Sequence, residues 1–163
     1  MSVIDELIFD RTQEDVDRVW ELKNKILEGG GLSALTSEEY AEFMAGMKGA
    51  YNQKDLNRIG EAIAYLVERM KDLAIYDATI VPNTDWVMGE WVTQSKIDNL
   101  LSCLTKLRAK LSLPANAPAV PATLDNLVYQ TANEIEELLY IIDGRITQTT
   151  SAFPYTGVRY CGQ

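Results

Sequence analysis

Residues 56–73 place apolar side chains at alternating spacings of three and four. This is the a/d pattern of a helix that buries one narrow face against another helix. A strand would instead need apolar residues at every second position. The pattern therefore predicts a helix with a narrow packing seam, and the seam consists of Leu56, Ile59, Ile63, Leu66, Met70 and Leu73.

Polar residues open this helix and lie along it. The side-chain oxygen of Asn52 can accept a backbone N–H that the first turn leaves unpaired, and Asp55 faces the positive end of the helix dipole. We assign Asn57 to the same helix start, and Arg58 and Glu61 to its solvated face. A chemical role for these five residues is the alternative.

Four further helices follow from start signals and apolar stripes. The first begins after Thr12, which Asp15 follows in a weak capping box, and glycines at 29–31 end it. The second has a stronger capping box, Thr36 with Glu39. The others run over about 93–111, where we expect Cys103 to be a small buried residue, and over about 123–146. Because short glycine turns favour antiparallel neighbours, we expect a mostly α protein of about five helices in antiparallel hairpins or a bundle.

The segments between the helices divide the chain, which we expect to form one structural unit. Residues 1–111 form a helical module with an irregular or β-like link at 76–92 that contains two tryptophans. The proline-rich stretch 112–122 predicts an extended connection. A long helix at 123–150 and an extended aromatic tail at 151–163 complete the chain.

The tail is rich in aromatic residues, and Pro154 confines any strand there to a sheet edge. Isolated hairpins are marginal, so this segment needs something to pack against. With the tryptophans of the link, it gives the predicted contact surface. The candidate interface residues are Trp86, Trp91, Phe153, Tyr155, Val158 and Tyr160.

Composition narrows the function classes. A net charge of −9 with scattered Lys and Arg argues against nucleic acid and anionic lipid as partners. Histidine is absent, which removes the commonest general base and metal ligand, and the two cysteines lie far apart. No signal peptide or membrane-spanning run is visible. We therefore expect no catalytic residues, no cofactor, no metal and no membrane partner.

Two alternatives remain open at this stage. Glu134, Glu136, Glu137 and Asp143 could serve glycoside hydrolysis or hold a divalent cation, although a solvated helix face is the default interpretation. The aromatic residues could instead form a platform for a glycan, with packing in a core or an interface as the competing interpretation. The candidate platform consists of Tyr51, Trp86, Trp91, Tyr155 and Tyr160.

Several motifs resemble virion structural proteins of phages and prophages of Gram-positive bacteria. They are "FDRTQEDVD" near the start, "MKGAYNQKDLNR" before the seam helix, "TDWVMGEWV" in the link and the aromatic tail. The resemblance covers nearly the whole chain, and the first two motifs are its most specific parts. In related sequences a Thr or Ser precedes "DLNR", where this chain has Lys54, so Asn52 has to cap the helix.

The resemblance implies a non-enzymatic component of the tail, baseplate or tail-fibre region of a particle. Such a protein would be made in the cytoplasm of the host bacterium and assembled into the virion. Its partners would be copies of itself and other virion proteins. The alternative function is a glycan-binding or cell-surface-binding module of a phage tail.

Overall fold

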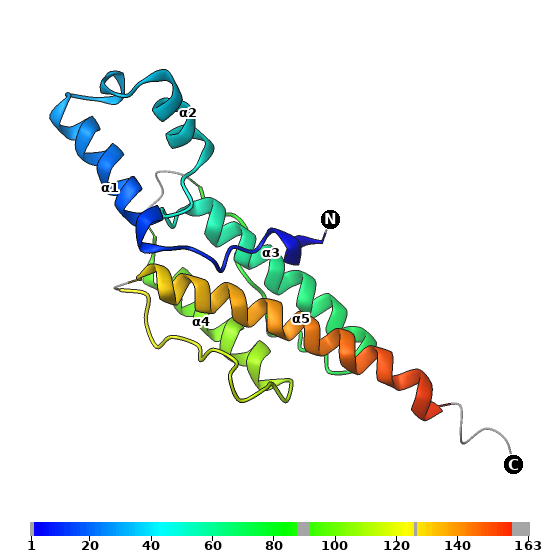
Figure 1. Ribbon diagram of the computed structural model, residues 1–163. Coiled ribbons are helices and arrows are strands. Elements are labelled where there is room, and N and C mark those ends of the chain that lie inside the picture. The colour runs from blue at the N-terminus through cyan, green and yellow to red at the C-terminus, as the bar shows by residue number, and fades with distance from the viewer. Residues whose placement is uncertain (1, 88–91, 126, 158–163) are drawn as a thin grey trace, which may run out of the picture.

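The structure is a computed structural model that describes residues 2–87, 92–125 and 127–157, with 153–157 described as backbone only. The chain is mostly helical, and its described part contains no strand (Figure 1). The α-helices of the described residues are α1 (Gln13–Glu28), α2 (Ser37–Ala45), α3 (Gln53–Arg69), α4 (Gln94–Ala109) and α5 (Tyr129–Gly157). Short 3-10 turns accompany them: η1 (Val3–Glu6), η2 (Leu32–Ala34) and η3 (Met70–Leu73).

Capping boxes start α1, α2 and α3; the sequence predicts the first two, and for α3 it predicts the Asn52 cap. Thr12 and Asp15 exchange side-chain and backbone hydrogen bonds at the start of α1, and Thr36 and Glu39 do the same at α2. At α3, the Asn52 side chain accepts from the Lys54 N–H at 2.9 Å, while the Asn52 N–H donates to the Asp55 carboxylate at 2.9 Å. These bonds satisfy N–H groups that the first helical turn leaves unpaired.

Helices α3, α4 and α5 form the body of the protein, and they run in the same direction. Arg58 and Arg69 of α3 pair with Glu136 and Asp143 of α5, so the order along both helices is the same. The direction of α4 follows from its contacts with the extended residues that precede it. Asn99 bonds Asn83, and Lys110 pairs with Asp77. Because those extended residues also run back along α3, helix α4 points the same way as α3 (Figure 1).

Parallel packing differs from the antiparallel arrangement expected for these helices. The reason lies in the connections, 74–93 and 110–128, which each return along the body before the next helix starts. A helix of 16 residues spans roughly 24 Å at 1.5 Å per residue, a distance that about seven extended residues cover. Both connections are therefore long enough to return to the same end. The expectation that a short glycine turn joins antiparallel helices holds only for α1 and α2.

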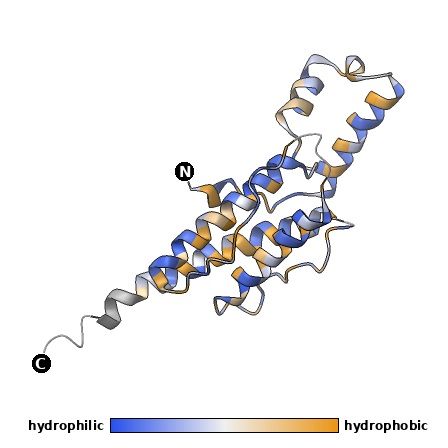
Figure 2. Ribbon diagram, turned by 180° about the vertical axis from the view of Figure 1, so that it is seen from behind, coloured by the Kyte–Doolittle hydropathy of each residue, from blue (hydrophilic) through white to orange (hydrophobic). Residues whose placement is uncertain are grey.

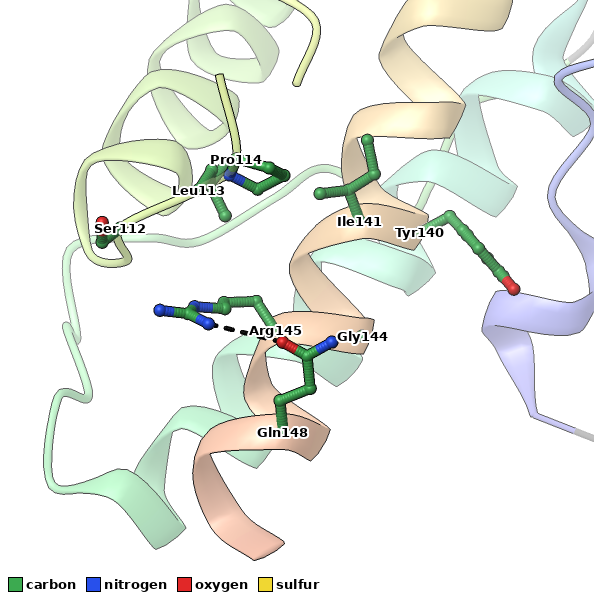
Figure 3. Close-up of a pocket in the computed structure, with 8 residues that line it drawn as sticks. All are labelled: Ser112, Leu113, Pro114, Tyr140, Ile141, Gly144, Arg145 and Gln148. Atoms are coloured by element: carbon green, nitrogen blue, oxygen red, sulfur yellow. Dashed lines mark hydrogen bonds between the residues drawn. The ribbon is translucent and has the colours of Figure 1, made fainter. Parts of the chain in front are cut away.

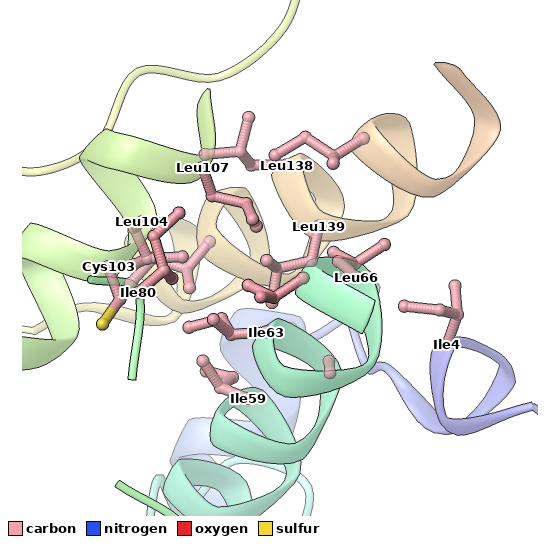
Figure 4. Close-up of a cluster of buried hydrophobic side chains, with 14 of the residues drawn as sticks. Ile4, Ile59, Ile63, Leu66, Ile80, Cys103, Leu104, Leu107, Leu138 and Leu139 are labelled. Atoms are coloured by element: carbon pink, nitrogen blue, oxygen red, sulfur yellow. The ribbon is translucent and has the colours of Figure 1, made fainter. Parts of the chain in front are cut away.

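The core lies between the three parallel helices and the segments that run back along them (Figure 4). All six seam residues of α3 and η3 are buried in it. Cys103 is buried among leucines, as expected, and burial raises the pKa of its thiol. The side chains that are almost fully buried in the body are Ile59, Ile63, Leu66, Met70, Leu104, Leu107, Ile135, Leu138, Leu139, Ile142 and Ile146.

Two element boundaries differ from the predicted ones. Helix α5 begins at Tyr129 rather than near Thr123, because Leu124 and Leu127 pack on the core from the extended segment before it. At its other end, α5 continues through Pro154 to Gly157, so residues 151–157 are helical rather than an extended tail. A proline this close to a helix end removes one backbone bond and leaves the rest of the helix intact.

The sequence predicts an irregular or β-like link at 76–92, and the irregular alternative is the one that its described residues adopt. Its described residues form turns and extended backbone without strand pairing. Gly60 explains how closely this segment approaches α3. A Cβ added at Gly60 would lie 2.1 Å from the backbone oxygen of Asn83. The backbone of the link therefore packs directly against α3.

Helices α1 and α2 form an arm that projects from the body (Figure 1). The two helices run in opposite directions, because Arg18 pairs with Glu42 while Lys25 pairs with Glu39. Only Leu22 is buried in α1, and no residue is buried in α2. The arm therefore contributes little to the core.

Substituting alanine at two helical glycines should have opposite effects. Gly60→Ala forces a Cβ into the link backbone and should lower the free energy of unfolding by about 1–3 kcal/mol. Gly144→Ala is the matched control in α5, where an added Cβ meets nothing within 4 Å. It should raise the free energy of unfolding by about 0.5–1 kcal/mol through helix propensity. Urea unfolding followed by circular dichroism measures both, and equal effects would contradict the described approach of the link.

Candidate functional site

Four charged residues meet inside the protein at the base of the arm, and we call them the charged clamp: Arg11, Asp55, Arg58 and Glu136. Arg11 Nη2 lies 2.9 Å from Asp55 Oδ1 and 2.7 Å from Glu136 Oε1. Arg58 donates to the same two carboxylates, including 3.0 Å from its Nε to Glu136 Oε2. Glu136 is fully buried, and Arg11 and Asp55 are nearly so. Two cations and two anions balance, as buried charges require.

Backbone groups complete the clamp around Arg11. The side chain of Asn133 accepts from the Arg11 N–H at 3.1 Å and donates to its carbonyl at 2.9 Å. The Arg11 guanidinium donates to the carbonyl oxygens of Lys48 and Ile8, and the Ile8 N–H donates to Glu136 at 2.7 Å. The clamp therefore joins four parts of the chain: the N-terminal segment, the residue that follows the arm, α3 and α5.

The electrostatics of the clamp favour the charged state of Arg58. Burial alone would lower the pKa of Arg58, but hydrogen bonds and charge attraction from Glu136 and Asp55 outweigh it and raise that pKa. Burial raises the pKa of the neighbouring Tyr51, and the carboxylates of Glu136 and Asp55 raise it further. Both shifts keep the ordinary protonation states, a cationic guanidinium and a neutral phenol.

The clamp fixes the position of the arm. Arg11 directly precedes the cap of α1, and Lys48 lies shortly after α2, so the bond between them closes the two ends of the arm. Lys48 Nζ also donates to the carbonyl of Asp10 at 2.8 Å. Gly49 packs so tightly that an added Cβ would lie 2.2 Å from the Asp15 carbonyl oxygen. Both carboxylates of the clamp form ion pairs with guanidinium groups. We therefore interpret the clamp as a structural connection between the arm and the body.

A surface hollow lies between the proline-rich segment and α5, where Figure 3 shows Ser112 and Leu113 across from α5. Among the described residues that line it, Arg145 alone is charged, and it donates to Gln148 at 3.3 Å. Within the ranges that the structure describes, no group of three His, Cys, Asp or Glu side chains is placed to hold a metal ion.

Exposed large hydrophobic residues are most numerous on the arm, and we call this group of residues the arm surface. Six of the thirteen large hydrophobic residues exposed in the described chain lie on it. Figure 2 shows hydrophobic residues recurring along both of its helices. The surface adjoins a hollow between Val16, Val19 and the first residues of α5. The six residues are Trp20, Leu27, Leu32, Tyr40, Phe43 and Met44.

Comparison with known proteins adds no relative. No protein-family profile, no curated protein and no solved structure matches this chain. Among the described residues, no helix combines the length and the hydrophobicity needed to cross a membrane. The candidate site therefore depends on the geometry of the clamp and the arm.

Of the predicted interface residues, Trp86 is the one whose side chain the structure describes. Trp86 is buried in the core, with its backbone bonded to the Asn57 side chain in both directions at 2.9 Å. It is a core residue rather than part of an exposed surface or a glycan platform. Phe153 and Tyr155 lie in the last turns of α5, and their side chains are outside the described part, as are Trp91, Val158 and Tyr160 altogether.

Sequence reasoning missed the clamp. Arg58 was assigned to solvent, yet it lies in the buried ion network, and Asp55 caps α3 while also serving that network. Glu136 was grouped with the exposed Glu134 and Glu137. One signal was available, because Glu136 lies on the helical stripe between Ala132 and Leu139, which are both buried.

Proposed function

We propose that this chain is a non-enzymatic structural component of a phage or prophage particle, in its tail, baseplate or tail-fibre region. It would act through protein–protein contacts with copies of itself and with other virion proteins. The observation that carries this proposal is the arm surface. It leaves large apolar side chains outside the core on an arm that the charged clamp joins to the body.

Two further points support a contact role. The motifs "FDRTQEDVD" and "MKGAYN…DLNR" resemble virion structural proteins, and in this fold both lie at the base of the arm, where Arg11 and Asp55 meet. Free monomers rarely expose large apolar patches, and such patches usually mark interaction sites. The aromatic residues after Thr150 would provide a second contact at the far end of α5, which projects beyond the body (Figure 1). The protein would be made in the host cytoplasm and assembled into the particle there.

Mass spectrometry of purified particles tests the proposal. Particles are collected after prophage induction of the source culture, and the copy number of this chain is measured relative to the major tail protein. An abundant cytoplasmic protein serves as the control for carry-over. A fixed ratio across independent preparations, well above the carry-over level, is expected. Expression of the chain without its presence in particles would overturn the proposal.

A further inference from the structure

Residues 32–45, which we call the strap, lie beside α1 without entering the core. They contain η2 and α2, and Figure 1 shows them running from the outer end of α1 back toward the body. The structure describes every residue of the strap, and none of them is buried. Because the burial of apolar side chains is the main force that holds a short helix in place, the strap is held weakly.

Two ion pairs join the strap to α1. Lys25 Nζ lies 2.6 Å from Glu39 Oε1, and Arg18 Nη2 lies 2.8 Å from Glu42 Oε2. The hydrogen bond from Lys25 lowers the pKa of Glu39 to about 2, so this carboxylate is charged at neutral pH. Both pairs lie at the surface of the protein. Exposed ion pairs contribute little to stability, and salt weakens them further.

Glycines with positive φ angles lie at both ends of the strap. Gly30 and Gly31 precede it with φ angles of 76° and 141°, and Gly46 follows it with 93°. A Cβ added at Gly30 or Gly31 would meet nothing within 4 Å, and at Gly46 it would meet the side chain of Lys54 at 3.7 Å. These glycines are therefore loosely packed, and they are able to absorb the backbone rotation of a hinge.

Helix α1 is attached differently, because its first turn packs against the body. A Cβ added at Gly49 would lie 2.2 Å from the backbone oxygen of Asp15 and 2.6 Å from the backbone nitrogen of Val16. Arg11, in the charged clamp, directly precedes the cap of α1. The strap can therefore move while α1 stays in place.

The strap covers an apolar face of α1. Leu22 is completely buried, although it lies in the arm. It falls between Arg18 and Lys25 on the helix face that meets the strap, and Val19 and Ile26 are its half-buried neighbours on that helix. Moving the strap away would expose Leu22 and widen the apolar surface that α1 presents.

We propose that the strap is a movable cover of α1, which its two ion pairs hold closed and which swings open about the glycines at its ends. The open state is the minor one, and a rise in ionic strength populates it further by screening the ion pairs. The device goes beyond the proposed function, because it makes the apolar surface of the arm larger in one state than in the other.

Hydrogen–deuterium exchange of the full chain, measured by mass spectrometry of its peptides, tests the inference. The amides of α2 should exchange at least about tenfold faster than the central amides of α1, because the strap opens locally while α1 stays helical. Raising the ionic strength to about 1 M shortens the screening length to about 3 Å and should speed the exchange of α2 about two- to fivefold.

Two variants act on the ion pairs and on the hinge. Lys25→Gln removes the pair with Glu39 and should speed the exchange of α2 about two- to fivefold. Gly46→Ala strains the closed state at a positive φ angle and should speed this exchange about fivefold or more. Lys71→Gln is the matched control, because Lys71 pairs with Glu68 outside the arm and its side chain is 47% exposed against 44% for Lys25. It should leave the exchange of α2 unchanged.

The exchange of α5 in the same samples verifies that the body stays folded in each variant. Equal exchange rates in α1 and α2 overturn the inference, because the arm would then open as one unit. An exchange rate of α2 that neither Lys25→Gln nor Gly46→Ala changes overturns it as well, since the ion pairs and the hinge would then have no part in the opening.

Discussion

Replacing Glu136 with alanine should lower the free energy of unfolding by about 3–5 kcal/mol, the cost of breaking a buried ion pair from one side. The reason is that Arg11 and Arg58 would keep only Asp55 as a carboxylate partner, and Arg11 is almost completely buried. The Ile8 N–H would lose its acceptor as well. Urea unfolding followed by circular dichroism at 222 nm measures the change. An unchanged dependence of the free energy of unfolding on urea concentration verifies two-state behaviour.

The neighbouring Glu137 provides the matched control, because it is exposed and lies on the same helix. Glu137→Ala should change the free energy of unfolding by less than about 0.5 kcal/mol, as substitutions at exposed positions do. Equal losses in the two variants would show that helix propensity or net charge, rather than the clamp, accounts for the effect. A stable Glu136→Ala variant would contradict the clamp directly.

Replacing Ile142 with alanine is the second large effect, with an expected loss of about 2–5 kcal/mol for a large-to-small change in a packed core. Ile142 is fully buried on the α5 stripe, where it contributes to the core that α5 shares with α3 and α4. The substitution leaves a cavity, because the neighbouring helices can close it only partly. Thermal and urea unfolding both report the loss.

Ile141 is the control for this prediction, since it is the adjacent residue of the same type and is only partly buried beside the surface hollow. Ile141→Ala should cost less than half as much as Ile142→Ala, because less area is removed from water. If the two losses were equal, the face of α5 that packs on the body would be assigned incorrectly.

Local signals in the sequence predicted the helices well. Two capping boxes and the Asn52 cap predicted the starts of α1, α2 and α3, because cap chemistry involves residues only a few positions apart. The a/d spacing identified the buried seam of α3 for the same reason. Boundaries were less accurate where tertiary contacts decide them, as at the start of α5, where Leu124 packs on the core without being helical.

Long-range features could not be predicted from the sequence. Arg11 and Glu136 are separated by 125 positions, and neither residue differs in type from solvated neighbours such as Arg18 or Glu137. The parallel direction of α3, α4 and α5 depends on connections that run back along the body. Connection length permits that path but does not require it. The arm surface could not be recognised from the sequence, because an apolar stripe looks the same whether its partner lies within the chain or beyond it.

The separation of contacts along the chain also sets an order of folding. The ion pairs of the arm join residues 14 and 24 positions apart, so the arm can pair as soon as its own residues have left the ribosome. Arg11 meets Glu136 only after nearly the whole chain has been synthesised. We therefore expect the arm to form before the body closes on it, so that a nascent chain presents the arm surface while its own core is still incomplete.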